Sequence, residues 1–383
     1  MKNSNYTLDD LVMVAARENN QRRKYLYVDP LQGKHIPVSP DKCLSLFSKL
    51  SDIIENHYRK EKLLVIGFAE TATAIGMAAA VNLKNVLYFM TTTRENVPDA
   101  EYLYFTEAHS HASIQKLVLN DLDECLKSVD RIVFVEDEVT TGNTIEQLIN
   151  ALNKKFYGIA HTFGIVSILN SMTDERLSEL EGKGIECDYI CRLPFEYRID
   201  SINSYIYNKI EDHTVVKDFD VNILRFKRYF DCRIVQNINA IRTGCNEFVG
   251  DALENLYISS EKSILVLGTE EFMYPAIILG NSIKQKYPDV QVRVHASTRS
   301  PIMTSDCVDY PLYNRSELDS IYESGRNTYI YNLAKYDKVI IVTDTYSFNK
   351  NGAFDLLTAL LKHENKNVVF LHWGGDETEK QLF

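Results

Sequence analysis

The sequence lacks the features of a membrane, secreted or nucleic-acid-coating protein. No apolar run in its 383 residues approaches the roughly 20 residues of a bilayer-spanning helix, and residues 1–20 hold no apolar signal core. Basic residues are outnumbered, with 42 Lys and Arg against 53 Asp and Glu and a net charge of −11. This balance argues against a surface that coats nucleic acid. We therefore expect a cytoplasmic protein with no membrane partner and disfavour nucleic acid as a partner.

Cysteine is scarce and scattered. The seven cysteines contain one close pair, Cys187 and Cys191, so the sequence predicts neither a disulfide framework nor a zinc ribbon. The hydrophobic content of 45% excludes global disorder, and 383 residues are enough for two domains with cores of their own.

The most informative segment is residues 131–145, RIVFVEDEVTTGNTI. Its β-branched and aromatic start predicts a buried strand of a parallel sheet, and Glu136 and Asp137 emerge at the carboxyl end of that strand. Ligands of open α/β sheets bind beyond the strand ends. Two acceptor-only carboxylates at such an end are placed to grip the neighbouring 2′ and 3′ hydroxyls of a ribose.

A threonine-rich turn follows the acidic pair. Gly142 allows a tight turn, and the amides at the start of the next helix point at a bound phosphate. That helix is predicted by apolar residues at helical spacing, namely Ile145, Leu148, Ile149, Leu152 and Phe156. The residues that we assign to the sugar phosphate are Thr140, Thr141, Gly142, Asn143 and Thr144.

This order of residues resembles the PRPP-binding signature of type I phosphoribosyltransferases, in which apolar residues precede an acidic pair, two variable positions and a Thr-Thr-Gly-x-Thr turn. Glu138 departs from that signature, which usually has an apolar residue there. The resemblance implies an α/β fold with a Rossmann-like parallel sheet and PRPP as a substrate. It also implies Mg²⁺ as a cofactor, bound by PRPP and, indirectly through PRPP and water, by Glu136 and Asp137.

A second anion loop precedes this signature. Residues 63–68 (LLVIGF) predict a buried strand before an Ala-rich helix. The turn that we assign to the pyrophosphate consists of Phe68, Ala69, Glu70 and Thr71. The alternative is a simple helix cap by Thr71 or Glu70. Arg94 follows the next predicted strand, and its fork of donors suits a diphosphate, so we assign it a catalytic role.

Residues 95–113 lose periodicity and predict a mobile lid that would keep water from the activated sugar. His109 and His111 in this segment are candidate catalytic residues, because their imidazoles could serve the leaving diphosphate or the nucleophile. A His-x-His pair can also bind zinc, although no third ligand stands at metal-site spacing. A solvated loop without a role is the remaining alternative.

Three segments narrow the resemblance to one family: residues 20–40, the stretch HSHAS, and the acidic triplet 136–138. They are similar to phosphoribosyltransferases of tellurite-resistance-type and stress-response gene clusters, whose second domain is named for a Thr-Arg-Ser-Pro motif. This chain has that motif at residues 298–301. Arg299 is therefore a candidate substrate contact, with a structural ion pair as the alternative. The family context implies synthesis or salvage of a nucleoside-like metabolite.

Type I enzymes use a variable segment, the hood, to choose the base, and the resemblance places residues 33–37 (GKHIP) in it. Lys34 and His35 are thus candidate substrate contacts; the alternative is a turn with solvated charges. We expect a phosphoribosyltransferase domain with this hood over residues 1–215 and the Thr-Arg-Ser-Pro domain over residues 216–383.

The second half looks like a divergent copy of the first. Residues 263–268 with the following residues 269–271 parallel the turn of residues 67–71, residues 298–299 parallel 93–94, and residues 338–344 parallel 131–137. A helix from about residue 353 follows. The alternative is the recurrence of strand, loop and helix that any α/β protein shows. The separation from Gly268 to Asp344 is 76 residues and that from Gly67 to Asp137 is 70. We therefore predict a second, degenerate phosphoribosyltransferase-like α/β domain. Type I enzymes commonly act as dimers, so a homo-oligomer or an intrachain pseudo-dimer is expected.

The favoured function is transfer of the 5-phosphoribosyl group of PRPP to a nitrogenous base, or the reverse reaction of a nucleotide with pyrophosphate. The main rival is a non-catalytic PRPP- or nucleotide-binding regulatory protein. A third is an RNA-associated protein that would use the basic and aromatic residues of segment 224–235. The histidine-bearing lid favours the enzyme over the sensor, and the acidic chain disfavours the RNA-associated protein.

Overall fold

The computed structural model describes residues 6–18, 20, 23–105, 115–159, 161–194, 196–208 and 221–374. The chain divides into two compact units. Unit 1 comprises Met1–Tyr6, Ser45–Phe195 and Phe230–Gly244, and unit 2 comprises Thr7–Leu44, Glu196–Tyr229 and Cys245–Phe383. This division differs from the single boundary after residue 215 that the sequence analysis predicted.

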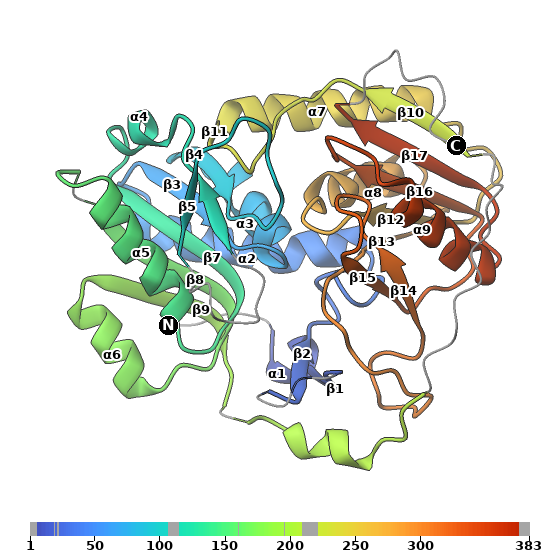
Figure 1. Ribbon diagram of the computed structural model, residues 1–383, viewed down its shortest axis with the longest axis horizontal. Coiled ribbons are helices and arrows are strands. Elements are labelled where there is room, and N and C mark those ends of the chain that lie inside the picture. The colour runs from blue at the N-terminus through green and yellow to red at the C-terminus, as the bar shows by residue number, and fades with distance from the viewer. Residues whose placement is uncertain are drawn as a thin grey trace. The chain divides into compact units, whose positions relative to one another are not determined.

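Unit 1 is built on one sheet with the strand order β11-β4-β3-β7-β8-β9 (Figure 1). Strand β11 is antiparallel to β4, and all other neighbours are parallel. The bounds of these strands are β3 Leu63–Gly67, β4 Val86–Thr91, β7 Arg131–Val139, β8 Thr162–Asn170, β9 Ile185–Arg192 and β11 Gln236–Asn237. A separate antiparallel hairpin consists of β5 Tyr102–Tyr104 and β6 Lys116–Val118.

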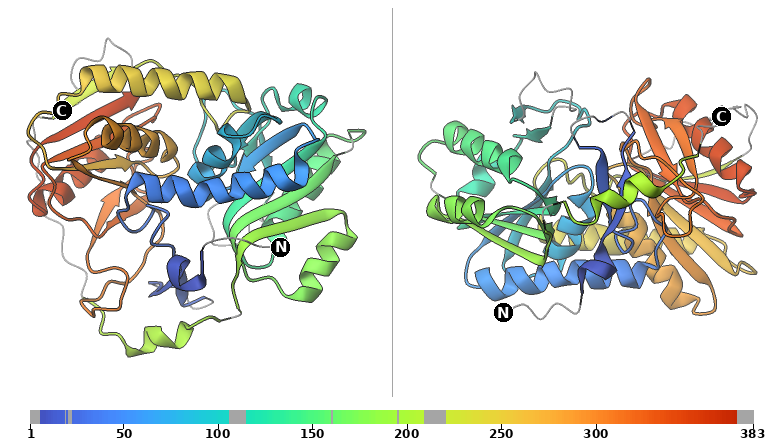
Figure 2. Two further views of the ribbon diagram at one scale, coloured as in Figure 1. Left: turned by 180° about the vertical axis from the view of Figure 1, so that it is seen from behind. Right: turned by 90° about the horizontal axis from the view of Figure 1, so that it is seen from below.

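Helices cover both faces of this sheet. Helix α3 connects β3 to β4 toward one edge of the sheet, and α5 connects β7 to β8 toward the other edge. Because such crossovers are right-handed, the two helices lie on opposite faces, as Figures 1 and 2 show. Strand β3 is buried at every residue, as its unbroken apolar sequence predicts for a strand covered on both sides. The helices are α3 Ala72–Val81, α4 Leu122–Leu126, α5 Asn143–Lys155, α6 Asp174–Gly182 and most of α2 Pro40–Tyr58.

Unit 2 has a five-stranded, all-parallel sheet with the order β10-β17-β16-β12-β13. Its strands are β10 Asn222–Phe226, β12 Ser263–Gly268, β13 Gln291–Ala296, β16 Lys338–Thr343 and β17 Val368–Trp373. The helices are α8 Tyr274–Lys286, α9 Lys350–Lys362 and the greater part of α7 Ile238–Asn255. A hairpin of β14 Arg315–Asp319 and β15 Asn327–Tyr331 precedes β16. The prediction of a second α/β domain is confirmed.

The hood segment belongs to unit 2. The whole segment Thr7–Leu44, which includes the expected hood, holds α1 Leu8–Leu11 and the antiparallel pair β1 Met13–Ala16 and β2 Tyr25–Val28. The short 3-10 helix Ile199–Ser204 also lies in this unit. Ala15 and Val28 are buried in one apolar cluster with Ile302, Tyr310 and Tyr331. The apolar side chains of this segment thus pack on residues of the second half.

In the part of the chain that the structure describes, no helix is both long and apolar enough to cross a membrane.

Candidate functional site

The acidic pair lies where β7 outruns its neighbour. The last residue of β3, Gly67, pairs with Val135, so Glu136 and Asp137 stand beyond the end of β3 while β7 continues beside β8 as far as Val139. The predicted position at the carboxyl edge is therefore found, although the strand is longer than the sequence suggested. Strand order reverses direction between β3 and β7, and this is the place where open α/β sheets bind ligands.

The surroundings of Glu136 disfavour the charged form of its carboxyl group. Removal of water by the surrounding protein, followed by the neighbouring charge of Asp137, raises the pKa of the Glu136 carboxyl well above its usual range, and the charge of Arg94 acts in the opposite direction. One Glu136 oxygen, Oε1, accepts a hydrogen bond of 3.1 Å from the Asp137 amide. Two carboxylates held this close favour a ligand that brings hydroxyl donors or a cation.

The loop that the sequence analysis assigned to the sugar phosphate has the predicted turn. Gly142 has a φ of 69°, the left-handed region that favours glycine, and a Cβ there would lie 3.3 Å from side-chain atoms of both Leu180 and Met172. Helix α5 starts directly after it, and its buried face consists of Ile145, Leu148, Ile149 and Leu152. The predicted amphipathic helix is confirmed except at Phe156, which is the C-cap after the last helical residue, Lys155. The N-terminal amides of the helix begin at the turn. Thr140, Thr141 and Asn143 are exposed and Thr144 is partly exposed.

Arg176, which lies outside the signature, forms hydrogen bonds with the loop of residues 140–144. Arg176, in the first turn of α6, donates from Nε to the carbonyl oxygen of Thr141 at 2.8 Å and from Nη2 to the Asn143 side chain at 3.1 Å. It also forms an ion pair of 2.6 Å with Glu146 of α5. No local sequence pattern predicts this role of Arg176, because its partner Thr141 lies 35 positions earlier in the chain.

The proposed pyrophosphate loop follows β3. Its backbone is tied to the neighbouring strand end, since the amide of Ala69 donates to Thr92 Oγ1 at 2.8 Å and the amide of Thr92 donates to the Gly67 carbonyl at 3.0 Å. Phe68, Ala69 and Glu70 are buried. Thr71 occupies the N-cap position of α3 without a side-chain cap bond, so the simple capping role is not realised by its hydroxyl.

His109 and His111 fall outside the described residues. Lys34 and His35 belong to unit 2 and are 1% and 5% exposed, which excludes the alternative of solvated charges. Lys34 Nζ donates to the backbone carbonyl of Glu270 at 2.5 Å.

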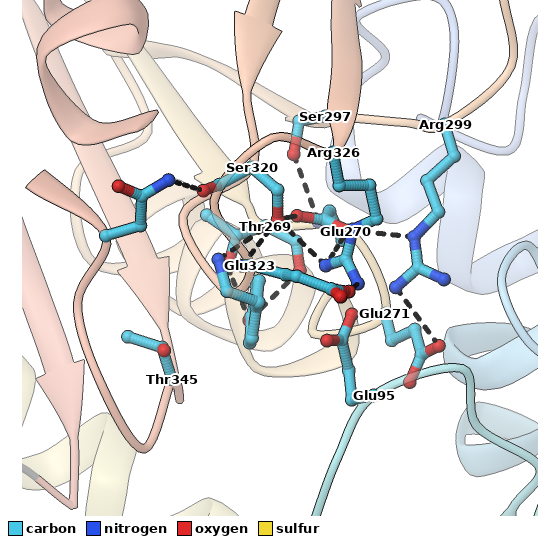
Figure 3. Close-up of polar contacts among 12 residues, drawn as sticks. Glu95, Thr269, Glu270, Glu271, Ser297, Arg299, Ser320, Glu323, Arg326 and Thr345 are labelled. Carbon is cyan, nitrogen blue, oxygen red and sulfur yellow. Dashed lines mark hydrogen bonds and ion pairs between the residues drawn. The ribbon is translucent and has the colours of Figure 1, made fainter. Parts of the chain in front are cut away.

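Arg299 of the Thr-Arg-Ser-Pro motif also lies in unit 2, at the carboxyl edge of its sheet (Figure 3). Its Nε donates to Glu270 Oε2 at 2.9 Å, and its Nη2 lies 3.5 Å from Glu271 Oε1. The side chains of Arg299 and Glu270 are 8% and 2% exposed. The ion pair that the sequence analysis named as the alternative for Arg299 is thus present.

Comparison with known proteins places both halves of the chain. Residues 11–193 match the family model of a phosphoribosyl transferase, and residues 237–360 match the TRSP domain that lies C-terminal to it. No curated protein matches the chain.

Solved structures similar to the chain include three phosphoribosyltransferases. Adenine phosphoribosyltransferase from Rhodothermus marinus is 13% identical, with 49% of this chain and 96% of that chain covered and a TM-score of 0.33. The adenine enzyme from Trypanosoma brucei, in complex with AMP, pyrophosphate and ribose-5-phosphate, is 11% identical, with coverage of 50% and 82% and a TM-score of 0.36. Orotate phosphoribosyltransferase from Aeropyrum pernix is 15% identical, with coverage of 48% and 87% and a TM-score of 0.31.

The two family matches account for most of the sequence. The first includes the N-terminal segment from residue 11 and the parallel strands of the unit 1 sheet, and the second includes β12, β13 and β16 of the unit 2 sheet. The chain therefore belongs to the family of phosphoribosyl transferases that carry a C-terminal TRSP domain.

Proposed function

We propose that the chain transfers the 5-phosphoribosyl group of PRPP to a ring nitrogen of a base, or runs the reverse reaction with pyrophosphate, in the synthesis or salvage of a nucleoside-like metabolite. The observation that carries the proposal is the position of Glu136 and Asp137 directly before a loop whose Gly142 turn opens helix α5. Carboxylates suit the sugar hydroxyls, and a helix N-terminus suits the 5′-phosphate.

Each group has a part in the reaction. The new bond joins the base nitrogen to the anomeric carbon, and the bond from that carbon to the diphosphate oxygen breaks. The transition state resembles an oxocarbenium ion, so Glu136 and Asp137 stabilise positive charge on the sugar that they hold. Arg94 and the loop of residues 68–71 hold the negative charge that develops on the diphosphate. Correct positioning of the two reactants supplies the rest.

Mg²⁺ fits the donor set of this site. Carboxylate oxygens are ligands that Mg²⁺ accepts, and it usually keeps several waters or phosphate oxygens as well. Among the described residues there is no group of three or more His, Cys, Asp or Glu side chains that could hold a metal. Glu136 and Asp137 would therefore hold Mg²⁺ indirectly, through water and PRPP, where it offsets the charge of the diphosphate.

Thermal melting with PRPP and Mg²⁺ tests the binding step. A ligand that binds only the folded state stabilises it by about 2.7 kcal/mol at a hundredfold excess over Kd, so the melting temperature of the wild type should rise. Asp137→Asn removes a ribose contact and should lose most of this rise, while the unliganded melting temperature stays nearly unchanged. Equal rises in the two proteins would overturn the proposed ribose grip.

Mass spectrometry of products separates the enzyme from a PRPP sensor. After incubation with PRPP, Mg²⁺ and a cell metabolite extract, the enzyme should release pyrophosphate and one new phosphoribosylated base. Binding of PRPP without any such product would favour the sensor.

His109 and His111 remain catalytic candidates from the sequence alone. If either transfers a proton or stabilises the leaving group, its replacement by alanine should lower turnover by roughly 10²-fold or more, with a smaller effect on PRPP binding. Normal turnover in both variants would show that neither histidine has a catalytic role and would leave the segment only the expected role of a lid. Recovery of metal-free protein by zinc and not by magnesium would support a metal site instead.

A further inference from the structure

The sheets of the two units share one topology. In unit 1 the order β4-β3-β7-β8 is built by α3, the β5–β6 hairpin and α5 between successive strands; in unit 2 the order β13-β12-β16-β17 is built by α8, the β14–β15 hairpin and α9. Each unit has one further parallel strand next to the last of these four: β9 beside β8 in unit 1 and β10 beside β17 in unit 2. The carboxyl edge of unit 2 is therefore the counterpart of the proposed PRPP edge.

Backbone hydrogen bonds give the match residue by residue. The Ser297 amide donates to the Gly268 carbonyl at 3.2 Å, as Thr92 does to Gly67, and the Glu270 amide donates to Ser297 Oγ at 3.1 Å, as Ala69 does to Thr92. Thr93 and Thr298 each bridge to the second strand of the following hairpin. Glu270 thus corresponds to Ala69 of the proposed pyrophosphate loop, and Arg299 corresponds to Arg94.

The carboxylate of Glu270 is held from three sides. Its Oε2 accepts from Arg299 Nε at 2.9 Å and from Arg326 Nη2 at 2.8 Å, and its Oε1 accepts from Ser320 Oγ at 2.5 Å (Figure 3). Two guanidinium groups on one oxygen is an arrangement for binding an oxyanion. Glu270 has a φ of 48°, which is costly for a residue with a Cβ, so the surrounding contacts must enforce it.

A second position of this edge is filled in the same way. Pairing of Gly268 with Val342 and of Gly67 with Val135 makes Asp344 the counterpart of Asp137. The Tyr322 hydroxyl donates to Asp344 Oδ1 at 2.8 Å, where a sugar hydroxyl would donate to Asp137.

The residues that fill both positions come from one loop. Ser320, Tyr322 and Arg326 lie between β14 and β15, and the whole loop is described. We propose that unit 2 is a phosphoribosyl-type site filled by its own chain: the Glu270 carboxylate stands where a diphosphate would bind, and the Tyr322 hydroxyl stands where a sugar hydroxyl would bind. This assignment rests on the function proposed for unit 1, because that function identifies the matched positions.

Removal of Glu270 should therefore create a site for diphosphate. The probe is inorganic pyrophosphate with the full chain, and the variant is Glu270→Ala, which restores the residue type of Ala69. We expect Glu270→Ala to melt below the wild type, and pyrophosphate to raise its melting temperature by several degrees more than that of the wild type. Titration calorimetry should count one more pyrophosphate per chain than in the wild type.

Three further variants sharpen this test. Glu323→Ala removes an exposed carboxylate from the same Arg326 and should behave as the wild type toward pyrophosphate. Glu270→Ala combined with Arg299→Ala should lose the added site. Tyr322→Phe alone should gain no pyrophosphate response, because it exposes a carboxylate and no cation. Should Glu270→Ala not fold, Glu270→Gln or refolding with pyrophosphate should recover folded protein.

The proposal would be overturned if folded Glu270→Ala bound no more pyrophosphate per chain than the wild type. It would also be overturned if the added site persisted in the double variant that lacks Arg299. If Glu270→Ala does not fold, failure of both Glu270→Gln and refolding with pyrophosphate to give folded protein would overturn it as well. The wild type decides a separate question: if it binds neither PRPP nor pyrophosphate, the function proposed for unit 1 fails, while the difference between Glu270→Ala and Glu323→Ala still reports on unit 2.

Discussion

Arg176 Nε donates to the carbonyl oxygen of Thr141 at 2.8 Å, so a residue of α6 sets the conformation of the loop that opens α5. The same guanidinium reaches Asn143 and Glu146, which leaves the loop little freedom to turn its amides away. A site that binds phosphate through backbone amides depends on such preorganisation.

We therefore expect Arg176→Ala to weaken PRPP binding. Hydrogen bonds from a charged group are worth about 1.5–3 kcal/mol, which corresponds to a rise in Kd of about 10- to 100-fold. The unliganded melting temperature should change little, because ion pairs that reach solvent contribute about 0–1 kcal/mol. Lys183→Ala is the matched control, since Lys183 also pairs with Glu146 and no contact of it with the loop is found among the described residues. Equal Kd values for Arg176→Ala and the wild type would contradict the role.

Gly142→Ala should damage both the loop and the fold. A left-handed conformation costs an L-residue about 1–2 kcal/mol, and the new Cβ also meets Leu180 and Met172. In a domain of this size each kcal/mol lowers Tm by about 2–4 °C, and PRPP affinity should fall as well. Gly158 has a φ of 98° with nothing within 4 Å of a Cβ. Gly158→Ala should therefore lower Tm and leave PRPP affinity intact; a loss of affinity there would show that the Gly142 effect is not local.

The acidic pair should limit stability at neutral pH. The pKa of Glu136 is raised in the folded state, so its contribution to stability is present at low pH and is lost as pH rises through the raised pKa. Glu136→Gln should melt higher than the wild type near pH 7, by about 2–4 °C if the relief is about 1 kcal/mol. Below about pH 4 the two melting temperatures should converge. The exposed Glu124→Gln is the control, and a difference between Glu136→Gln and the wild type that does not vary with pH would refute the prediction.

Acid should weaken unit 2 through His295. Its ring nitrogens lie 3.3 Å from the carbonyl oxygen of Gly33 and 2.8 Å from that of Tyr331, and burial lowers its pKa to about 4. A lowered pKa means that the neutral form stabilises the fold above about pH 6.5 and that this stability is lost as pH falls toward 4. The slope is about 1.4 kcal/mol per pH unit. His295→Gln should be less stable at pH 7 but should show a shallower decline from pH 6.5 to 4; an unchanged slope would count against His295.

Local pattern predicted much of the phosphoribosyltransferase half. The helical spacing of Ile145, Leu148 and Leu152 depends on neighbours within two turns, and the order strand, acidic pair, glycine turn and helix is contained in 26 residues, Arg131 to Phe156. The position of the hood could not be predicted in this way. Its contacts, such as the bridge between Val38 and Val294, join residues far apart in sequence.

The partners of Arg299 and Arg176 escaped prediction for the same reason. The sequence shows the charge of an isolated arginine. Which carboxylate or carbonyl it contacts depends on how loops after different strands are placed in the fold. The β14–β15 loop supplies Ser320 and Arg326 to Glu270 across about fifty residues. Local periodicity of the sequence does not predict contacts between such distant residues.

The alternation of six chain segments between the two units matters during synthesis. The amide of Ala16 donates to the hydroxyl of Tyr310 at 2.9 Å, a separation of 294 residues, and β4 of unit 1 pairs with β11. At about 5–20 residues per second, a ribosome needs about 15–60 s to deliver Tyr310 after Ala16. For that long the apolar side chains of the β1–β2 hairpin lack the partners that they have in the folded chain, namely Ile302, Tyr310 and Tyr331. Because the two units alternate along the chain, no single cut in the sequence separates them.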